Sequence, residues 1–411
     1  MYLSGIGGGQ LYTLRKATFM KKKGYEILVI CGKKDPIELD QLNEFRIFEA
    51  REFLNNYFVF RKASSDAAID RVADFISKNA NGEIIIESTD IIRSVWADKI
   101  ASRLQARYFV YDISGSPIRS FEIARFASFK FRKKQLIGCS KYSNQKLFAN
   151  FPEYYDESKN LYVNVPFDNS EIVDDTKGAE FSKDPNTLRI LTVSRIEKKY
   201  LTYLIGEVSK VAQIIPNKTL ELTMVLSRRK GKEFDILEKQ SLNVPKNMKV
   251  SFLGPIVPLT KSLFLTHNVF VGVGTASLNA ISLGVPTIVA DFNSDKSIGI
   301  LGIDAKDFGY APINDITISQ QIQRFLDNPT LFLEASEAGL RLFQKEYESS
   351  AVMNKFMENV ERIMKQEPEY YSFDKISLSG REKLKKALMS IAGVKGYDFL
   401  VRFYARHRTS K

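Results

Sequence analysis

Short apolar runs alternate with helix-periodic segments along most of this chain of 411 residues. The helix-periodic segments carry apolar side chains at every third or fourth position, whereas the runs between them are rich in β-branched and aromatic residues, as strands are. In the first half, the strand-like runs are Tyr25–Cys31, Tyr57–Phe60, Glu83–Glu87, Arg107–Asp112, Gln135–Ser140 and Leu161–Val165. Parallel strands need a crossover helix between them, so this alternation predicts a doubly wound α/β domain.

A second series of the same kind follows a polar, acidic segment without periodicity. This segment, Phe167–Asn186, is predicted to link two domains. The later strand-like runs are Leu188–Val193, Leu220–Leu226, Val250–Gly254 and Val269–Val271. We expect an N-terminal Rossmann-like domain over residues 1–170 and a second Rossmann-like domain over 171–345. Residues 346–411 are expected to return toward the first domain and to end in a basic helical tail. Ligands bind at the carboxyl ends of such strands, which places the expected active site in a central cleft that the two domains face.

Composition narrows the classes of function. The formal net charge of +12 and the pI of about 9.3 favour polyanionic partners: nucleic acid, an anionic membrane or phosphorylated substrates. No zinc-finger spacing, aromatic RNA-binding signature or basic zipper is present, which makes nucleic acid the weaker choice. No apolar run reaches the roughly 20 residues that span a membrane. The two cysteines and two histidines give neither a disulfide framework nor a histidine-rich metal centre, and they fit a reducing cytoplasm.

The stretch Val269–Ala290 has the most informative local pattern: a strand, a glycine turn, a short helix and a second strand. Gly272 and Gly274 allow a sharp turn and a close approach of the backbone to a ligand. Thr275 is the expected N-cap of the helix, and Gly284 is its expected C-terminal stop. Free N–H groups and the helix dipole favour an anionic group at such a helix start. An ordinary βαβ unit without a ligand is the alternative.

A second glycine cluster, Gly7, Gly8 and Gly9, precedes a helix predicted over Leu11–Lys23. It is another candidate for binding an anion. Only Met1–Leu3 comes before it, so either the first strand is very short or the chain begins further upstream.

A basic turn follows the strand Leu188–Val193. Ser194, Arg195 and Lys199 lie in this turn. A guanidinium and an ammonium at a strand end can clamp a diphosphate and stabilise the charge of a leaving phosphate. A solvated basic loop is the alternative.

The segment after Ser377 is basic and amphipathic. Apolar side chains recur at helical spacing at Leu384, Leu388 and Ile391, and again at Tyr397, Leu400, Val401 and Tyr404. Nine basic residues outnumber Glu382 and Asp398: Arg381, Lys383, Lys385, Lys386, Lys395, Arg402, Arg406, Arg408 and Lys411. This pattern predicts contact with an anionic membrane surface, and a helix packed on the first domain is the alternative. A second basic and aromatic segment, Arg119–Lys134, is expected near the cleft, where a lipid-linked or anionic acceptor can approach.

Taken together, these motifs resemble those of the GT-B glycosyltransferases, and among them the retaining family 4. That family has a glycine-rich first loop, matched by Gly7–Gly9, and a Ser/Gly-Arg…Lys signature, matched by Ser194, Arg195 and Lys199. Its donor-site run, E-G-F-G-x-x-x-x-E-A-x-x-x-G-x-P-V-I, is matched by Val271–Ile288. The resemblance covers nearly all of residues 1–365 and leaves out the basic tail. No single motif is specific, but their order and spacing together are.

The resemblance implies a nucleotide diphosphate sugar as the donor, with no separate cofactor and no metal. The residues implied to contact this donor are Ser194, Gly274, Thr275, Ser277 and Asn279, together with Gly7, Gly8 and Gly9 from the first domain. Arg195 and Lys199 are implied to stabilise the leaving diphosphate. Retention of configuration is also implied. In that mechanism the departing phosphate assists the incoming hydroxyl, so the protein needs no strong nucleophile.

The chain departs from the family pattern at both glutamates of the donor-site run, where it has Val271 and Asn279. In the family, the first acidic residue contacts the sugar and the second contacts the ribose. Asn279 can still hydrogen-bond a ribose hydroxyl, whereas Val271 cannot bond a sugar hydroxyl. The spacing from Arg195 to Lys199 is one residue shorter than in the commonest version. Where such enzymes often carry a histidine, this chain has Asp112, either a general base or a capping aspartate.

The leading hypothesis is a hexosyltransferase-type enzyme that moves a sugar from a nucleotide diphosphate sugar to a glycan or lipid-linked acceptor. Its expected setting is bacterial surface polysaccharide assembly, in the cytoplasm, as a peripheral protein at the inner face of the plasma membrane. The loss of both glutamates favours a rival, a catalytically degenerate GT-B protein that binds a nucleotide sugar or scaffolds glycan assembly. A nucleotide-sugar epimerase is the third hypothesis. It would need several acidic and histidine groups for proton removal, and the N-terminal half has no histidine.

Overall fold

The computed structural model describes residues 2–3, 8–34, 44–167, 172–176, 184–373, 378 and 380–408. The chain divides into two compact units: unit 1 is Met1–Val165 with Met353–Lys411, and unit 2 is Pro166–Val352. The chain passes between the units twice, and the two segments next to these points pair with each other. Phe167 N–H donates to Tyr347 O and Ser349 N–H donates to Phe167 O, both at 2.9 Å. The domain ends expected after residues 170 and 345 therefore both lie within unit 2.

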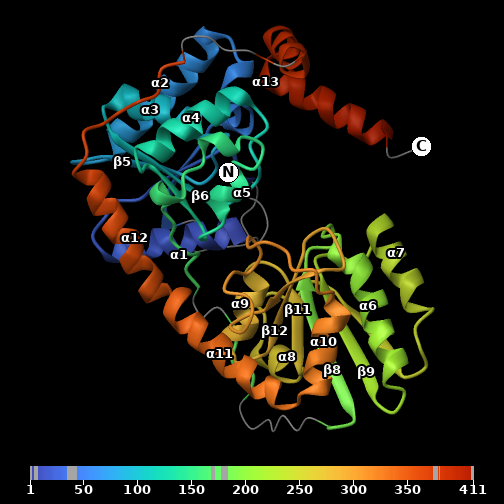
Figure 1. Ribbon diagram of the computed structural model, residues 1–411. Helices are drawn as coiled ribbons and strands as arrows, with labels where there is room; N and C mark the ends of the chain where they lie inside the picture. The colour runs from blue at the N-terminus through green and yellow to red at the C-terminus, as the bar shows by residue number, and fades with distance from the viewer. Residues whose placement is uncertain are drawn as a thin grey trace. The chain divides into compact units, whose positions relative to one another are not determined.

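Within the described residues, unit 2 is built on a six-stranded sheet in the order β10-β9-β8-β11-β12-β13 (Figure 1). Its strands are β8 (Thr187–Ser194), β9 (Thr219–Leu226), β10 (Met248–Leu253), β11 (Val269–Gly272), β12 (Thr287–Ala290) and β13 (Ser297–Ile300). Neighbouring strands are parallel except for the antiparallel pair β12 and β13. The chain enters the sheet at β8, moves outward to β10 and returns on the other side of β8 with β11. The direction of strand succession thus reverses between β8 and β11.

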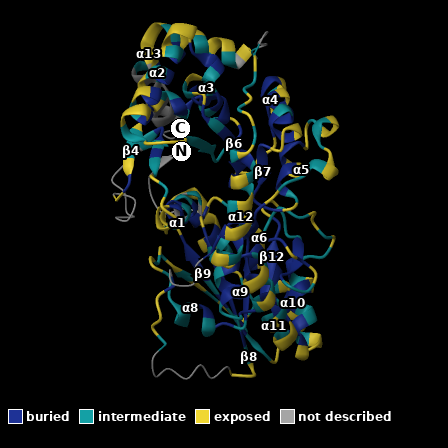
Figure 2. Cartoon of the chain, turned by 90° about the vertical axis from the view of Figure 1, so that its left-hand side faces the viewer, coloured by how far each residue is buried: buried dark blue, intermediate teal, exposed yellow. Residues whose placement is uncertain are grey.

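Helices cover both faces of this sheet. Ile190 and Leu222 belong to an apolar cluster completed by α6, α7, α10 and α11, while Leu191 and Val225 belong to another completed by α8 and α9. The helices are α6 (Tyr200–Ile214), α7 (Lys232–Ser241), α8 (Lys261–Leu265), α9 (Thr275–Ser282), α10 (Ile318–Asp327) and α11 (Thr330–Glu346). Successive strand residues point to opposite faces, and both sets are buried here, which explains the continuous apolar runs in the sequence (Figure 2). The predicted doubly wound fold is confirmed for this unit.

Unit 1 pairs its described strands in parallel, as β1 with β3, β2 with β4, and β5-β6-β7. The strands are β1 (Tyr2–Leu3), β2 (Leu28–Cys31), β3 (Lys33–Lys34), β4 (Arg46–Glu49), β5 (Ile85–Ser88), β6 (Arg107–Asp112) and β7 (Leu136–Gly138). The α-helices described before residue 166 are α1 (Gly8–Lys22), α2 (Lys62–Asn79), α3 (Ser94–Leu104), α4 (Phe121–Arg132) and α5 (Ser143–Leu147). The alternation of strands and helices predicted from the sequence is therefore present in this unit too.

Two predicted strands of unit 1 are wrong. Tyr57–Val59 forms a 3-10 helix, η3, because the side chain of Asn56 accepts a hydrogen bond from Phe58 N–H and turns the backbone. Its aromatic residues pack in the core of unit 1, where the ring of Tyr57 lies edge-on to that of Trp96 with centroids 5.0 Å apart. In Leu161–Val165 the only pairing found in the described chain is an isolated bridge from Tyr162 to Gly138.

The basic and aromatic segment Arg119–Lys134 also differs from expectation. It forms α4, in which Phe126 and Phe131 are completely buried. Lys130 is buried as well, and its ammonium forms a 2.6 Å ion pair with the equally buried Asp98 of α3. At these positions the pattern belongs to the core of unit 1 and not to a surface open to an acceptor.

The C-terminal segment packs on unit 1. After α12 (Ser349–Met364), an extended stretch lies across α3 and α4, where Tyr371 N–H donates to Asp98 at 3.1 Å and Lys99 donates to Tyr371 O at 3.0 Å. The last helix, α13 (Gly380–Arg408), is interrupted at Gly393, whose φ is 65° and ψ 177°. None of the helices in the described part of the chain is long and apolar enough to cross a membrane.

Candidate functional site

The basic turn after β8 lies at the carboxyl edge of the sheet in unit 2. Arg195 and Lys199 are exposed there, while Lys198 is half-buried. The ammonium of Lys198 donates a 2.9 Å hydrogen bond to the carbonyl oxygen of Val273, in the turn after β11. It also lies 3.8 Å from the position that a Cβ would take on Gly274. The basic turn and the glycine turn, separate motifs in the sequence, are therefore one structural site.

Burial lowers the pKa of Lys198 to about 8, and the positive charge of Arg195 contributes to this shift. An ammonium in this environment has lost water and faces a like charge, so its charged form is held less favourably than in solvent. An anion placed beside Lys198 and Arg195 would reverse both effects. The electrostatics of the turn therefore favour a negatively charged ligand.

The sequence prediction paired Arg195 with Lys199, and the structure brings Lys198 rather than Lys199 to the glycine turn. Tyr200 sets this register, because its hydroxyl lies 2.8 Å from that of Thr192 and its N–H donates to Phe292 O at 3.2 Å. Its side chain is completely buried at the start of α6. A large aromatic residue directly after two lysines was the signal in the sequence for this register.

Glycine is required at the last residue of β11, Gly272, and at the N-cap of α9, Gly274. Gly274 has a φ of +84° and is the N-cap of α9, so the expected N-cap, Thr275, is the first residue of the helix. The N–H of Gly274 donates to Phe308 O at 2.8 Å. A Cβ on Gly272 would lie 2.6 Å from the ring of Phe270, closer than any side chain tolerates. Both glycines therefore fix the path by which the chain enters α9.

Ser277, the third residue of α9, carries an unusual hydroxyl. The residue is completely buried, and its Oγ has no hydrogen-bond partner among the residues that the structure describes. Leaving a buried polar group unsatisfied costs about 1–3 kcal/mol, so the fold holds this hydroxyl at a disadvantage. It lies in the first turn of a helix, where the dipole favours negative charge. A ligand oxygen would supply the missing partner once the groups that cover this hydroxyl move aside.

The two positions that depart from the family pattern have different surroundings. Val271 is completely buried among apolar residues of β8, α6 and α10, in the main cluster of unit 2. Asn279 is half-buried on α9, and its side-chain amide makes no hydrogen bond to the described residues. The amide of Asn279 is therefore still available to a ligand, whereas the side chain of Val271 packs in the core and offers a ligand no contact.

A third segment, the loop after Ala305, completes the site. Asp307 accepts hydrogen bonds from the N–H groups of Gly309, at 2.8 Å, and Ala311, at 3.3 Å. This carboxylate fixes the loop that presents Phe308 O to the glycine turn. A Cβ on Gly309 would lie 2.7 Å from the side chain of Val273, so glycine is needed for this contact. Asp307 was not singled out in the sequence, because an aspartate near a glycine has no distinctive pattern there.

The position of these three segments follows from the strand order. Arg195 and Lys198 follow β8, and the glycine turn follows β11, the two strands between which strand succession reverses. At such a switch point the adjacent crossovers go to opposite faces of the sheet and leave a crevice at the carboxyl ends of the strands. Ligands of open α/β sheets bind there, which makes this the candidate site of unit 2.

In unit 1, Asp112 ends β6 and is 1% exposed. Its carboxylate accepts hydrogen bonds from Gly115 N–H at 2.9 Å, Ile91 N–H at 3.3 Å and the Ser114 hydroxyl at 3.1 Å. Burial raises the pKa of Asp112 to about 7, and the negative charge of Asp90 adds to the shift. These contacts are those of a capping aspartate, and a role as general base stays a prediction.

The glycine cluster of unit 1 is only partly described. Gly7 lies outside the described residues, and Gly8 and Gly9 are the first two residues of α1 and not part of a loop before it. Further along α1, Lys16 is ion-paired with Glu87 at the end of β5 and donates to the hydroxyl of Tyr12 at 2.6 Å. Burial lowers the pKa of Lys16 well below its usual value. These contacts fasten α1 to the carboxyl edge of this sheet.

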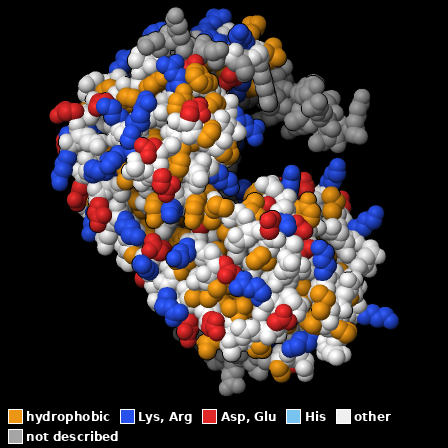
Figure 3. Space-filling view, viewed as in Figure 1, with side chains coloured by type: hydrophobic (Ala, Val, Ile, Leu, Met, Phe, Trp, Pro, Cys, Tyr) orange, Lys and Arg blue, Asp and Glu red, His pale blue; other side chains and the backbone are white. Residues whose placement is uncertain are grey.

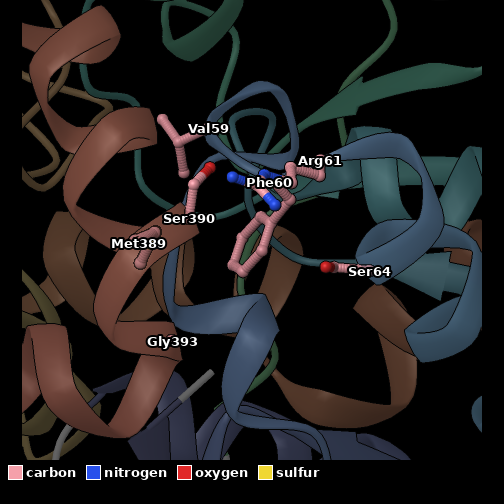
Figure 4. Close-up of a pocket in the computed structure, with 7 residues that line it drawn as sticks. All are labelled: Val59, Phe60, Arg61, Ser64, Met389, Ser390 and Gly393. Carbon is pink, nitrogen blue, oxygen red and sulfur yellow. The ribbon is translucent and has the colours of Figure 1, made fainter.

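A pocket of about 190 Å³ lies in unit 1 between the start of α2 and α13 (Figure 4). It is lined by Val59, Phe60, Arg61, Ser64, Met389, Ser390 and Gly393. Sites for small molecules usually measure about 300–1,000 Å³, so this pocket is too small for a nucleotide sugar. The described part of the chain contains no group of three or more side chains placed to hold a metal ion.

No family model and no curated protein matches the sequence. A glycosyltransferase from Rickettsia africae ESF-5 is similar in structure, with a TM-score of 0.68 over 89% of this chain and 97% of that one, at 13% identity. The chain has the GT-B fold. Two other solved GT-B structures are similar at comparable coverage.

The first is the lipopolysaccharide outer core galactosyltransferase WaaB in its apo form, with a TM-score of 0.59 and 12% identity over 88% of this chain and 97% of that one. The second is sucrose-phosphate synthase from Thermosynechococcus elongatus, with a TM-score of 0.58 and 13% identity over 88% and 95%. Similarity at such low identity bears on the fold alone. The GT-B fold class predicted from the sequence is thereby confirmed.

Proposed function

We propose that this chain is a glycosyltransferase that moves a sugar from a nucleotide diphosphate sugar to a glycan or lipid-linked acceptor. The observation that carries the proposal is the site at the switch point of unit 2. There the ammonium of Lys198 meets the glycine turn at Val273, and the first turn of α9 carries Ser277, whose hydroxyl has no partner among the described residues. A cation, a helix start and such a hydroxyl at the carboxyl edge of a doubly wound sheet suit a diphosphate.

In the proposed complex, Lys198 and Arg195 neutralise the diphosphate, and Ser277 donates a hydrogen bond to one of its oxygens. Asn279, one turn further along α9, hydrogen-bonds the ribose. As the bond from the sugar to the diphosphate breaks, negative charge grows on the leaving oxygen, where the two cations stabilise it. The acceptor oxygen forms the new bond to the sugar, and its proton passes to the departing phosphate. Configuration is retained in this mechanism, which requires no protein nucleophile.

The proposed setting is bacterial surface polysaccharide assembly at the cytoplasmic face of the membrane. The support is the net charge of +12, which attracts an anionic surface where a lipid-linked acceptor would be found. Basic side chains on the face in Figure 3 are dispersed among acidic ones, with no large basic patch on that face. The tail after Ser377, with nine basic and two acidic residues, carries +7 of the total charge of +12.

The test is release of nucleoside diphosphate from a panel of nucleotide sugars, with and without lipid-linked acceptor. We expect release from at least one donor, and Lys198→Met should reduce it by at least about tenfold, because a charged contact to a phosphate is worth about 1.5–3 kcal/mol. Lys199→Met is the matched control, since this lysine is exposed and should change release less than twofold. Absence of binding by every donor to folded protein would refute the proposal.

A degenerate GT-B protein that binds a nucleotide sugar without transferring it is the second candidate. The observation that favours it is the burial of Val271 in the core, where the family pattern has a carboxylate that contacts the sugar. The same panel separates the two functions. Binding of a donor that depends on Lys198, without release of nucleoside diphosphate in the presence of any acceptor, would support the degenerate protein.

A further inference from the structure

The first half of α13 presents an apolar stripe that no part of the described chain covers. Leu384, Leu388 and Ile391 have exposed fractions of 63%, 37% and 85%. Residues of an α-helix advance by about 100° each, so these three side chains fall within about 60° of one another. In Figure 3, apolar side chains are visible on the described part of α13. A cluster of exposed aliphatic side chains on one helix face marks an interaction surface.

The opposite face of the same helix is fixed to unit 1. Met389 is only 6% exposed and packs into the cluster that contains Val59 and Phe60 (Figure 4). Glu382 accepts a 3.0 Å hydrogen bond from the side-chain amide of Asn56. These contacts set the rotation of the helix about its axis, so the stripe faces away from the rest of unit 1.

Basic residues flank the stripe. At about 100° per residue, Lys383 lies to one side of Leu384 and Lys385 lies to the other. Lys383 is exposed, and its long side chain can keep its ammonium group at the level of lipid headgroups. Lys385 is half-buried, with its ammonium 5.1 Å from the centroid of the Tyr397 ring. The chain from Arg381 onward has nine basic and two acidic residues, hence +7 of the total charge of +12. This combination is typical of helices that lie in the plane of an anionic membrane surface.

We propose that Leu384, Leu388 and Ile391 form a docking face that inserts into the headgroup region of an anionic bilayer. This inference rests on the peripheral membrane location proposed above and assigns it to one helix face. The backbone leaves helical geometry at Gly393, which limits the docking helix to the turns before it. The sequence beyond Gly393 contains five further basic residues, Lys395, Arg402, Arg406, Arg408 and Lys411, and one acidic residue, Asp398.

The charge distribution favours a bilayer over a second copy of this chain. A symmetric contact through the stripe would bring Lys383 and Lys385 of one copy close to those of the other, and like charges across an interface oppose association. Anionic headgroups complement the same lysines.

The experiment is co-sedimentation of the full chain with vesicles of phosphatidylglycerol and phosphatidylcholine, compared with phosphatidylcholine alone. The test variant is Leu384→Ser/Leu388→Ser/Ile391→Ser. The matched control is Ile214→Ser/Leu242→Ser/Leu333→Ser, whose parent residues in unit 2 are exposed to 64%, 79% and 65%. We expect the parent chain and the control to bind anionic vesicles, and the test variant to bind at least about tenfold more weakly because its apolar contact is lost. Binding of the parent chain should weaken as salt is added.

A spectroscopic readout locates the contact. The chain has one tryptophan, Trp96, which is 1% exposed and gives a constant background. Emission from the added indole of Ile391→Trp should shift to shorter wavelength with anionic vesicles and not with neutral ones.

Three results would overturn the inference. The first is binding of the test variant equal to that of the parent chain, and the second is equal binding of the parent chain to neutral and anionic vesicles. The third is a parent chain that self-associates through the stripe, becomes monomeric in the test variant and binds no vesicle. Binding of nucleotides measured on the same preparations is independent of these outcomes, so a failure here is distinguishable from a failure of the transferase proposal.

Discussion

At the scale of single residues, Ser277 has opposite effects on folding and on the proposed ligand contact. Its buried hydroxyl has no partner within the described residues, so its removal should relieve a cost of folding. We predict that Ser277→Ala raises the free energy of unfolding by about 1 kcal/mol and weakens binding of a nucleoside diphosphate about tenfold. Chemical denaturation and calorimetry measure the two effects.

Ser282, at the end of the same helix, is the matched control. Its hydroxyl is also mostly buried, but it donates a 2.8 Å hydrogen bond to Asn279 O. Ser282→Ala should therefore lower the free energy of unfolding by about 1 kcal/mol and leave nucleotide affinity nearly unchanged. Equal destabilisation by both substitutions would mean that Ser277 has a partner in the folded protein and would remove it from the proposed site.

Lys198 predicts a pH dependence of nucleotide binding. Its pKa of about 8 in the free protein should rise when an anion is bound, because the charged form gains a partner. Affinity for a nucleoside diphosphate should fall as the pH rises through 8, with proton uptake on binding near pH 8. Lys198→Arg keeps its charge and should lose this dependence. Calorimetry in buffers of different ionisation enthalpy tests it, and identical pH profiles for the two proteins would contradict the assignment.

The same lysine affects stability in a defined direction. Its pKa is lower in the folded chain than its ordinary value of 10.5, so between pH 8 and 10.5 the unfolded chain binds more protons than the folded one. The contribution of Lys198 to stability therefore rises with pH across this window, whereas nucleotide affinity falls.

Residue types in this site were predictable, but their contacts were only partly so. Gly274, Arg195 and Ser277 were identified from motif spacing, since glycine and hydroxyl residues at a helix start have a recognisable pattern. The contact of Lys198 depends on the burial of Tyr200, and the support from Asp307 comes from a loop more than 30 residues further along the chain. Spacing along a chain cannot show which of two adjacent lysines faces a neighbouring strand.

At the scale of elements, the buried pair of Lys130 and Asp98 joins α4 to α3 and fixes the returning segment at Tyr371. Both side chains are 0% exposed, so loss of one partner leaves an uncompensated charge in the core. Asp98→Asn should lower the free energy of unfolding by about 3–5 kcal/mol. Asp98→Asn/Lys130→Met should regain part of this loss, because no buried charge is then left alone. Thermal and denaturant unfolding measure the effect.

An exposed pair serves as the control. Arg341 and Glu337 on α11 are four residues apart, 3.3 Å from each other and mostly exposed. Arg341→Ala should change stability by about 0.5 kcal/mol or less, as solvent screens such pairs. A loss for Asp98→Asn no larger than this would show that the returning segment does not depend on the buried pair.

Helices and strands were well predicted where the apolar residues followed one clear pattern, either a continuous run or helical spacing. Every strand of unit 2 up to β12 was found within a few residues of its apolar run, because both faces of that sheet are covered by helices. Tyr57–Phe60 had the composition of a strand but became η3, since the side chain of Asn56 turned the backbone. The segment Arg119–Lys134 had the composition of a basic surface, but its pairing with Asp98 was not visible in the sequence. Local patterns therefore failed where a distant side chain supplied the deciding contact.

At the scale of the whole molecule, the two units differ in how many segments of the chain build their cores. Unit 2 is one continuous segment, Pro166–Val352, and the apolar clusters around its sheet draw on residues of that segment alone. Unit 1 is discontinuous, and the cluster around Phe126 is completed by Tyr370, Tyr371 and Phe373 from the returning segment. The sequence analysis expected residues 346–411 to return toward the first domain, but it did not show that the core of unit 1 depends on them.

We therefore predict that a fragment covering residues 166–352 folds alone and binds a nucleoside diphosphate, whereas a fragment covering 1–165 does not unfold cooperatively. In the shorter fragment, Phe126 lacks the ring of Phe373 at 5.8 Å, and Asp98 lacks the N–H of Tyr371. A permuted fragment that joins 353–411 to 1–165 through a flexible linker should restore cooperative unfolding. Circular dichroism melts and calorimetry with nucleotides distinguish the three fragments. If residues 1–165 alone melt as sharply as the permuted fragment, the returning segment is not needed for the cooperative folding of unit 1. If 166–352 folds without binding any nucleotide, the site at the end of β8 needs residues from outside unit 2.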